Sequence, residues 1–104
     1  MRRIVFIVNP VSGTTHRKIW VEKAIKELGT DYETDVIQTQ YRGHGHLIAK
    51  ELAGECTDTI VAVGGDGTVN EIGGAVIGSN TKLAIFPMGS GNGLARELGM
   101  STKR

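Results

Sequence analysis

The run Gly64-Gly65-Asp66-Gly67-Thr68 has the composition of a phosphate-binding loop. Gly64 and Gly65 carry no Cβ, so the backbone can approach a phosphate closely, and Gly67 allows an unusual backbone angle. If a helix begins here, its free N–H groups and the positive end of its dipole favour an anion. The run therefore predicts an anion-binding site.

Asp66 is unusual inside such a site, because a carboxylate repels an anion. Its presence is explained if a Mg²⁺ ion lies between Asp66 and a phosphate, or if Asp66 orients a hydrogen-bond donor there. Thr68 and Asn70 would add side-chain hydrogen bonds to the same anion. The alternative is a tight turn in which Asp66 is only the N-cap of the following helix.

Two more loops combine glycine with small polar residues. Asn9-Pro10-Val11-Ser12-Gly13 comes directly after the apolar run 4–8. Gly89-Ser90-Gly91-Asn92-Gly93 comes shortly after the apolar run 83–86. Each loop also has a purely structural interpretation. In the first loop, Asn-Pro would start a turn and Ser12 would cap a helix. The second loop would serve as a hinge. Both are also suited to phosphate contact, since hydroxyl and amide groups stand among glycines.

The elements that must position these loops alternate between strand and helix. Apolar and β-branched runs predict strands over residues 4–8, 32–39, 59–63 and 83–86. Apolar residues on one helical face predict helices over residues 16–28, 43–53, 67–77 and 92–98. This order predicts an α/β fold, a three-layer, doubly wound parallel sheet of the Rossmann-like type. Because ligands bind beyond the carboxyl ends of parallel strands, the three loops are expected at one edge of the sheet.

Composition narrows the class of protein. A length of 104 residues suits a single domain over 1–104, and 39% hydrophobic with 22% charged residues is typical of globular proteins. The net charge of +1 gives no reason to expect a nucleic-acid partner. A single cysteine, Cys56, excludes an internal disulfide and fits a cytoplasmic location. The apolar runs are too short for a transmembrane segment.

Two common nucleotide-binding motifs are absent. Gly13 is followed by Thr14 and Thr15 without the second glycine and the Lys-Ser/Thr pair of a P-loop. The first loop has one glycine and the second strand ends in Thr39-Gln40, whereas a dinucleotide fingerprint needs G-x-G-x-x-G and an acidic residue. A hydride-transfer dehydrogenase is therefore disfavoured.

Taken together, the loops resemble the N-terminal, nucleotide-binding half of diacylglycerol kinase catalytic domains, a family that includes the sphingosine kinases. The matching pieces are Asn9-Pro10-Val11-Ser12-Gly13, Thr39 with Gly43-His44, residues 63–71, and residues 87–92 with Ala95-Arg96. They span nearly the whole chain. The Gly-Gly-Asp-Gly-Thr piece is shared with NAD kinases, whereas Asn-Pro-x-Ser-Gly narrows the match to lipid kinases. The last loop is closer to the sphingosine kinase pattern, which leaves the lipid open.

The resemblance implies a site for ATP with Mg²⁺, in which Asp66 is the critical residue and has a catalytic role. No residue is assigned as a direct metal ligand. The residues that the resemblance assigns to the nucleotide are Asn9, Pro10, Ser12, Gly13, Thr39, Gly64, Gly65, Gly67, Thr68, Asn70, Glu71, Gly89, Ser90 and Asn92. His44 is interpreted as a structural residue at a helix start and His46 as a surface residue. Gly45 stands where the family usually has alanine.

The implied reaction is transfer of the ATP γ-phosphate to the hydroxyl of a lipid, either diacylglycerol or a sphingoid-like lipid. Family members hold the lipid in a β-rich second domain that these 104 residues lack, so we expect little kinase activity from them alone. Two alternatives are an NAD-kinase-like enzyme and a non-catalytic nucleotide-binding or assembly module. An open sheet with exposed apolar surface also predicts self-association.

Overall fold

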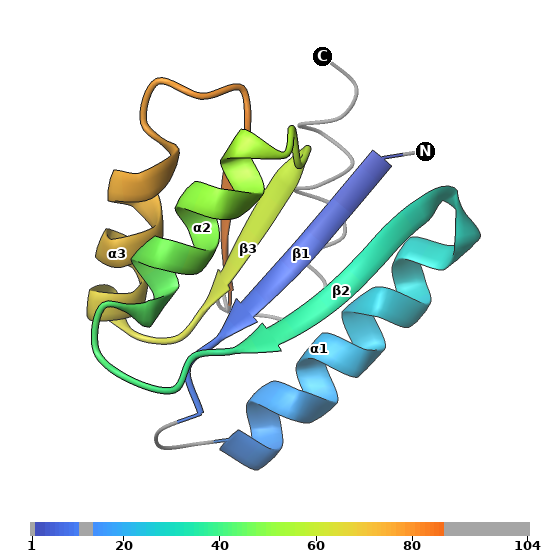
Figure 1. The fold of residues 1–104 in the computed structure, drawn as a ribbon. Coiled ribbons are helices and arrows are strands. Elements are labelled where there is room, and N and C mark those ends of the chain that lie inside the picture. Colours follow the sequence, from blue (N-terminus) through green and yellow to red (C-terminus); the bar gives the residue numbers. More distant parts are fainter. Residues whose placement is uncertain (1, 11–13, 87–104) are drawn as a thin grey trace.

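A computed structural model describes residues 2–10 and 14–86 of the chain. Strands and helices alternate along the described residues, which confirms the α/β class (Figure 1). The elements are β1 (Arg2–Val8), α1 (Thr14–Leu28), the 3₁₀ helix η1 (Gly29–Asp31), β2 (Tyr32–Gln38), α2 (His44–Gly54), β3 (Thr59–Val63), α3 (Asp66–Val76) and β4 (Lys82–Phe86).

The strands form one parallel sheet in the order β2-β1-β3-β4. β1 is central, and its last residue, Val8, lies opposite Gln38 of β2 on one side and Val63 of β3 on the other. The chain moves outward from β1 to β2 and then returns to the other side of β1 as β3. The strand order therefore reverses between β1 and β3, which is where doubly wound sheets bind their ligands.

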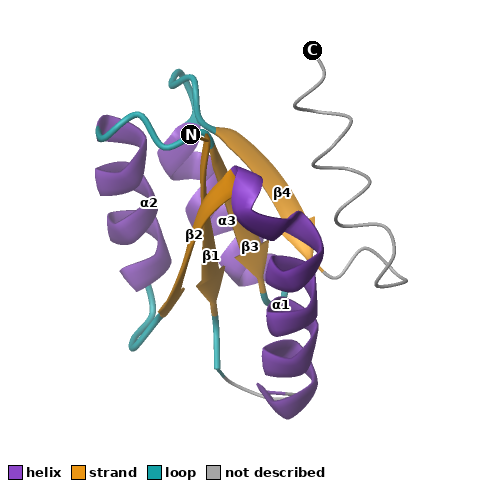
Figure 2. Cartoon of the chain, turned by 90° about the vertical axis from the view of Figure 1, so that its right-hand side faces the viewer, coloured by secondary structure: helices purple, strands orange, loops and turns teal. Residues whose placement is uncertain are grey.

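Helices cover both faces of the sheet, with α1 on one face and α2 and α3 on the other (Figure 2). Alternate residues of β1 serve the two cores: Phe6 and Val8 pack on the α1 side, and Val5 and Ile7 pack on the opposite side. Because both faces of β1 and β3 are buried, their sequences are continuous apolar runs rather than alternating ones. Trp20 of α1 is half-buried against the first core, as its place on the helix face predicts.

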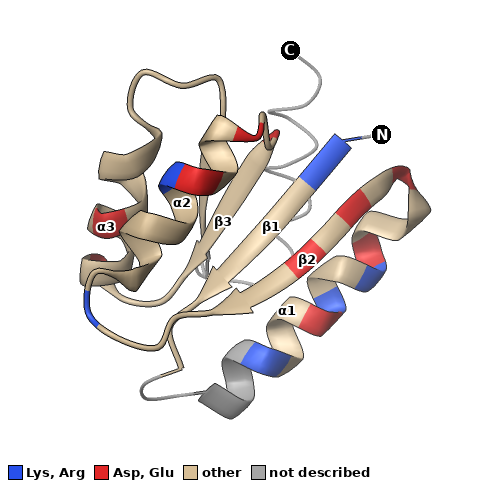
Figure 3. Cartoon of the chain, in the orientation of Figure 1, with Lys and Arg blue, Asp and Glu red and all other residues tan. Residues whose placement is uncertain are grey.

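The outer strand β2 has a different pattern, in which charged residues interrupt the apolar run. Glu33 and Asp35 are exposed, and Val36 is 47% exposed. Figure 3 shows the acidic residues along this strand. Charged side chains are common on edge strands, because they discourage pairing with another chain.

Several helix ends differ from the expectation by one or two residues. α3 begins at Asp66 rather than at residue 67, so Gly67 lies within the helix. The expected unusual backbone angle at Gly67 is wrong, because the glycines with positive φ among the described residues are Gly29, Gly43 and Gly78. The helix expected over residues 92–98 lies outside the described residues.

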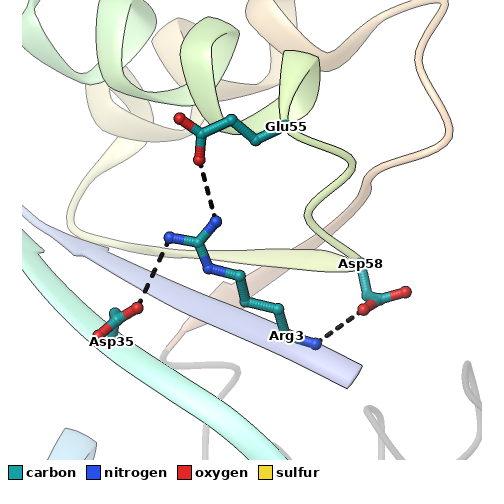
Figure 4. Close-up of polar contacts among 4 residues, drawn as sticks. All are labelled: Arg3, Asp35, Glu55 and Asp58. Carbon is teal, nitrogen blue, oxygen red and sulfur yellow. Dashed lines mark hydrogen bonds and ion pairs between the residues drawn. The ribbon is translucent and has the colours of Figure 1, made fainter. Parts of the chain in front are cut away.

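Polar contacts at the amino-terminal edge of the sheet fasten its strands together (Figure 4). The guanidinium group of Arg3 donates to Oε1 of Glu55 at 3.0 Å and lies 3.6 Å from Oδ2 of Asp35. The backbone N–H of Arg3 donates to Oδ2 of Asp58 at 2.7 Å. The hydrogen bond to Glu55 raises the pKa of Arg3. These contacts join β1 to β2 and to the α2–β3 connection, opposite the edge of the sheet where the candidate site lies.

Candidate functional site

A cavity of about 380 Å³ opens at the carboxyl edge of the sheet, where the strand order reverses. Three segments that are distant in sequence build its walls: the residues after β1, the residues after β2, and the first turns of α3. Its lining consists of Asn9, Pro10, Thr39, Gln40, Tyr41, Arg42, Gly67, Thr68 and Glu71. The prediction that the loops after β1 and β3 lie at one edge of the sheet is therefore confirmed.

Asn9 and Thr68 connect the ends of β1 and β3 across the floor of this region. The backbone N–H of Asn9 donates to the carbonyl of Val63 at 2.9 Å, and its side-chain Nδ2 donates to Oγ1 of Thr68 at 3.1 Å. Thr68 is only 5% exposed. A threonine hydroxyl can donate one hydrogen bond while it accepts others, so Thr68 can also act as a donor.

The glycines of the loop after β3 have two different structural roles. A Cβ at Gly64 would lie 2.6 Å from Oγ1 of Thr68 and 3.2 Å from Cβ of Asn9, so packing alone requires glycine there. Within the described residues, a Cβ at Gly65 or Gly67 would meet nothing within 4 Å. The open space around Gly65 and Gly67 is what a ligand approaching the backbone needs.

The loop leads directly into the amino-terminal end of α3. Gly65 is the N-cap, with an extended backbone, and its carbonyl accepts the first helical hydrogen bond from Val69 at 3.1 Å. Asp66 follows as the first helical residue and is exposed, so the alternative that Asp66 is the N-cap is wrong. N–H groups of a first helical turn lack partners within the helix and, with the helix dipole, attract anions. Gly67 and Thr68 of this turn line the cavity.

The segment 40–43 follows β2, and its first three residues form a wall of the cavity that the sequence did not predict. The N–H of Gln40 donates to Nδ1 of His44 at 2.9 Å, and the ring of Tyr41 stacks on that of His44 with centroids 4.5 Å apart. The N–H of Gly43 donates to Oε2 of Glu71 at 3.0 Å. The available signal was position, because these residues directly follow β2 and must lie at the carboxyl edge of a parallel sheet.

The two histidines of α2 have distinct environments. His44 is the first residue of α2 and holds the preceding loop, which confirms its structural interpretation. His46 is half-buried, and its Nδ1 lies 3.2 Å from the backbone carbonyl of Glu71. The interpretation of His46 as a surface residue is therefore wrong, because the close packing of α2 on α3 covers part of its ring.

Not every residue assigned from the sequence lines the cavity. Asp66 and Asn70 are exposed on α3 beside the lining residues, and Gly64 and Gly65 lie in the turn just before them. The remaining assigned residues lie outside the described residues and are Ser12, Gly13, Gly89, Ser90 and Asn92.

Residues 2–10 and 14–86 contain no group of three or more His, Cys, Asp or Glu side chains arranged to hold a metal ion. Over the same residues, no helix has the length and apolar character needed to cross a membrane.

A doubly wound parallel sheet whose glycine-rich turn meets a cavity at the point of strand reversal defines an α/β domain of the ligand-binding, Rossmann-like class. Comparison with known proteins gives the particular family. The family model described as the diacylglycerol kinase catalytic domain matches residues 3–104. The chain therefore belongs to the diacylglycerol kinase catalytic domain family, which is a family of kinases.

Two curated relatives illustrate the similarity. The chain is 36% identical over 103 residues to a diacylglycerol kinase of Bacillus subtilis (strain 168), covering 96% of the chain and 34% of that protein. It is 36% identical over 100 residues to a diacylglycerol kinase of Staphylococcus aureus (strain MRSA252), covering 93% of the chain and 32% of that protein. The chain thus spans about a third of the length of these relatives.

Proposed function

We propose that this chain is the nucleotide-binding part of an ATP-dependent lipid kinase, in which a lipid hydroxyl attacks the γ-phosphorus of ATP. The observation that carries the proposal is the cavity at the reversal of strand order, because it gathers residues assigned from separate sequence motifs. Those residues are Asn9, Pro10, Thr39, Gly67, Thr68 and Glu71. A volume of about 380 Å³ is within the usual range of small-molecule sites.

The start of α3 is where the phosphates of ATP would bind. Within the described residues the backbone is open at Gly65 and Gly67, the Thr68 hydroxyl can donate a hydrogen bond while it accepts one from Asn9, and the helix dipole favours negative charge. The cation of Arg42 lines the same cavity. The ring of Tyr41, which is 59% exposed, offers a flat surface to the nucleotide base on the wall formed by residues 40–43.

Asp66 has the chemistry to hold Mg²⁺ with ATP. Protein sites usually bind this ion through one or two carboxylates, water and the substrate's own phosphates, so a cluster of protein ligands is not needed. Asp66 supplies an exposed carboxylate in the first turn of α3, one residue before the cavity lining. When bound, Mg²⁺ would neutralise phosphate charge, and Asp66 would fix its place relative to the helix.

The lipid is proposed to be diacylglycerol, because both relatives are diacylglycerol kinases, and to bind outside the cavity described above. Phosphoryl transfer needs both substrates held in line, and this chain covers about a third of those relatives. We therefore expect the 104 residues to bind ATP but to transfer little phosphate by themselves.

A cytoplasmic location and self-association are further parts of the proposal. The exposed apolar side chains of Leu47 on α2 and of Ile77, directly after α3, support association between copies. Gel filtration coupled to light scattering tests this part, and a monomer at every concentration examined would contradict it.

Calorimetric titration of the chain with ATP tests the nucleotide site. We expect binding that Mg²⁺ strengthens, and we expect Asp66→Ala to remove most of that strengthening while Asp31→Ala, an exposed carboxylate in η1, leaves it intact. Absence of ATP binding would contradict the proposed function. Equal dependence on Mg²⁺ in Asp66→Ala and in the parent chain would remove Asp66 from the site.

A further inference from the structure

Glu71 of α3 reaches across to the start of α2. Its carboxylate Oε2 accepts a hydrogen bond from the N–H of Gly43 at 3.0 Å, and its backbone carbonyl lies 3.2 Å from Nδ1 of His46. The two helices lie side by side on one face of the sheet (Figures 1 and 2). Glu71 therefore contacts the first turn of α2 through both its side chain and its backbone.

The start of α2 has a specific need for this carboxylate. Its N-cap, Gly43, has φ of 91° and provides no side-chain cap, and its first turn contains no acidic residue. A negative charge near a helix amino terminus is favourable, and a hydrogen bond to a charged acceptor is stronger than a neutral one. Glu71, on the neighbouring helix α3, thus supplies the negative charge and the hydrogen-bond acceptor that the first turn of α2 lacks.

Gly45 makes room for the other carboxylate oxygen. A Cβ at Gly45 would lie 3.0 Å from Oε1 of Glu71, which is closer than ordinary van der Waals contact. Oε1 therefore rests against the first turn of α2 at a place where only hydrogen projects from the backbone. This contact gives a physical reason for glycine at this position.

The consequence concerns the wall of the cavity. Gly43 ends the 40–43 segment, and the preceding residues of that segment, Gln40, Tyr41 and Arg42, line the cavity. Holding Gly43 fixes the carboxyl end of the wall, while the contacts of His44 with Gln40 and Tyr41 fix the rest.

We propose that Glu71 is a positioning residue whose carboxylate holds the 40–43 wall, rather than a ligand of the nucleotide phosphates. This inference rests on the proposed nucleotide site. It also accounts for a carboxylate in the lining of an anion site, because the charge of Glu71 is directed to the N–H of Gly43 and to the positive end of α2.

Amide hydrogen exchange measured by NMR on the ligand-free 104-residue chain tests the contact directly. In Glu71→Ala we expect the Gly43 amide to exchange about tenfold faster, which corresponds to losing one hydrogen bond to a charged group. In Glu71→Gln, which keeps an acceptor oxygen, the increase is expected to be smaller. The amide of Glu55, bonded to Glu51 at the other end of α2, serves as an internal reference that stays unchanged.

Titration of the same variants with ATP then separates positioning from direct contact. We expect Glu71→Ala to weaken ATP binding about fivefold to tenfold, Glu71→Gln to weaken it less, and Glu27→Gln, an exposed carboxylate on α1, to have no effect. Glu71 is a direct ligand if both Glu71 variants lose ATP affinity equally while the exchange rate of the Gly43 amide in the ligand-free chain is unchanged. That result would overturn the inference.

The two proposals can fail separately. The exchange of the Gly43 amide needs no nucleotide, so a chain that does not bind ATP would refute the proposed function and still decide whether Glu71 holds Gly43. An unchanged Gly43 amide in Glu71→Ala would refute the inference even if ATP binds as proposed.

Discussion

Alanine substitutions at the two adjacent glycines after β3, Gly64 and Gly65, should differ in their effect on stability. In Gly64→Ala the new Cβ would lie 2.6 Å from Oγ1 and 2.9 Å from Cβ of Thr68. Thr68 is 5% exposed and belongs to the first turn of α3, so it can move away only if the helix start moves with it. In Gly65→Ala the new Cβ would meet none of the described residues within 4 Å.

Three contributions determine how much Gly64→Ala changes the free energy of unfolding. Overpacking costs about 1–3 kcal/mol. Loss of the bond between Asn9 and Thr68 costs about 1 kcal/mol more, and the lower entropy of the unfolded chain returns about 0.4–1 kcal/mol. We therefore expect the free energy of unfolding to fall by about 1–3.6 kcal/mol, which lowers the melting temperature by roughly 4–20 °C in a domain of this size.

Gly65→Ala is the matched control for stability and a separate test of the site. The preference for glycine over alanine at an N-cap and the entropy of the unfolded chain oppose each other, so the expected change in unfolding free energy is below about 1 kcal/mol. ATP affinity should nevertheless fall, because the methyl group projects where the phosphates are proposed to bind. Urea unfolding and calorimetry measure both quantities. The reasoning is refuted if Gly64→Ala is as stable as the parent chain, or if Gly65→Ala is the less stable of the two.

Three further substitutions probe different contacts. Asn9→Asp places a carboxylate in the cavity lining and should weaken ATP binding at least about tenfold by charge repulsion, whereas the neutral Asn9→Ser should weaken it less; equal affinities in a titration would contradict this. Arg3→Gln removes the contacts with Glu55 and Asp35 and should lower the unfolding free energy by about 0.5–1 kcal/mol, with a smaller effect in about 1 M NaCl; a loss independent of salt would count against an ionic contribution. Gly45→Ala should displace the neighbouring carboxylate and speed exchange of the Gly43 amide while α2 stays helical, and an unchanged amide in the NMR spectrum would show that the side chain tolerates the methyl group.

The sequence predicted the central strands well because their environment leaves a simple pattern. β1 and β3 are buried on both faces, so they appear as unbroken apolar runs. Helix ends were less predictable, because they depend on the conformation of one flanking residue. At α3 the extended backbone of Gly65 makes Gly65 the N-cap, so Asp66 is the first helical residue. Gly67 therefore lies inside the helix and does not have a positive φ.

The site was predicted where it lies in glycine-rich motifs and missed where it depends on distant contacts. Asn9 and Thr39 directly follow strands, and Thr68 lies in the first turn of the helix after β3, so the parallel sheet brings all three to one edge. The cavity wall formed by residues 40–42 contains no sequence motif that indicates a ligand site. It is held by Glu71, which is 28 residues from Gly43 in sequence, and only the packing of α2 on α3 shows that contact.

The central claim is that ATP binds at the reversal of strand order, with its phosphates at the start of α3. The most direct test is a nitrogen-15 NMR titration of the chain with ATP and Mg²⁺, following every backbone amide. The account predicts that the largest shifts occur at Asn9, residues 39–43 and residues 65–69, with little change at the opposite edge around Arg3 and Asp58. Shifts concentrated away from the cavity, or none at saturating ATP, would contradict it.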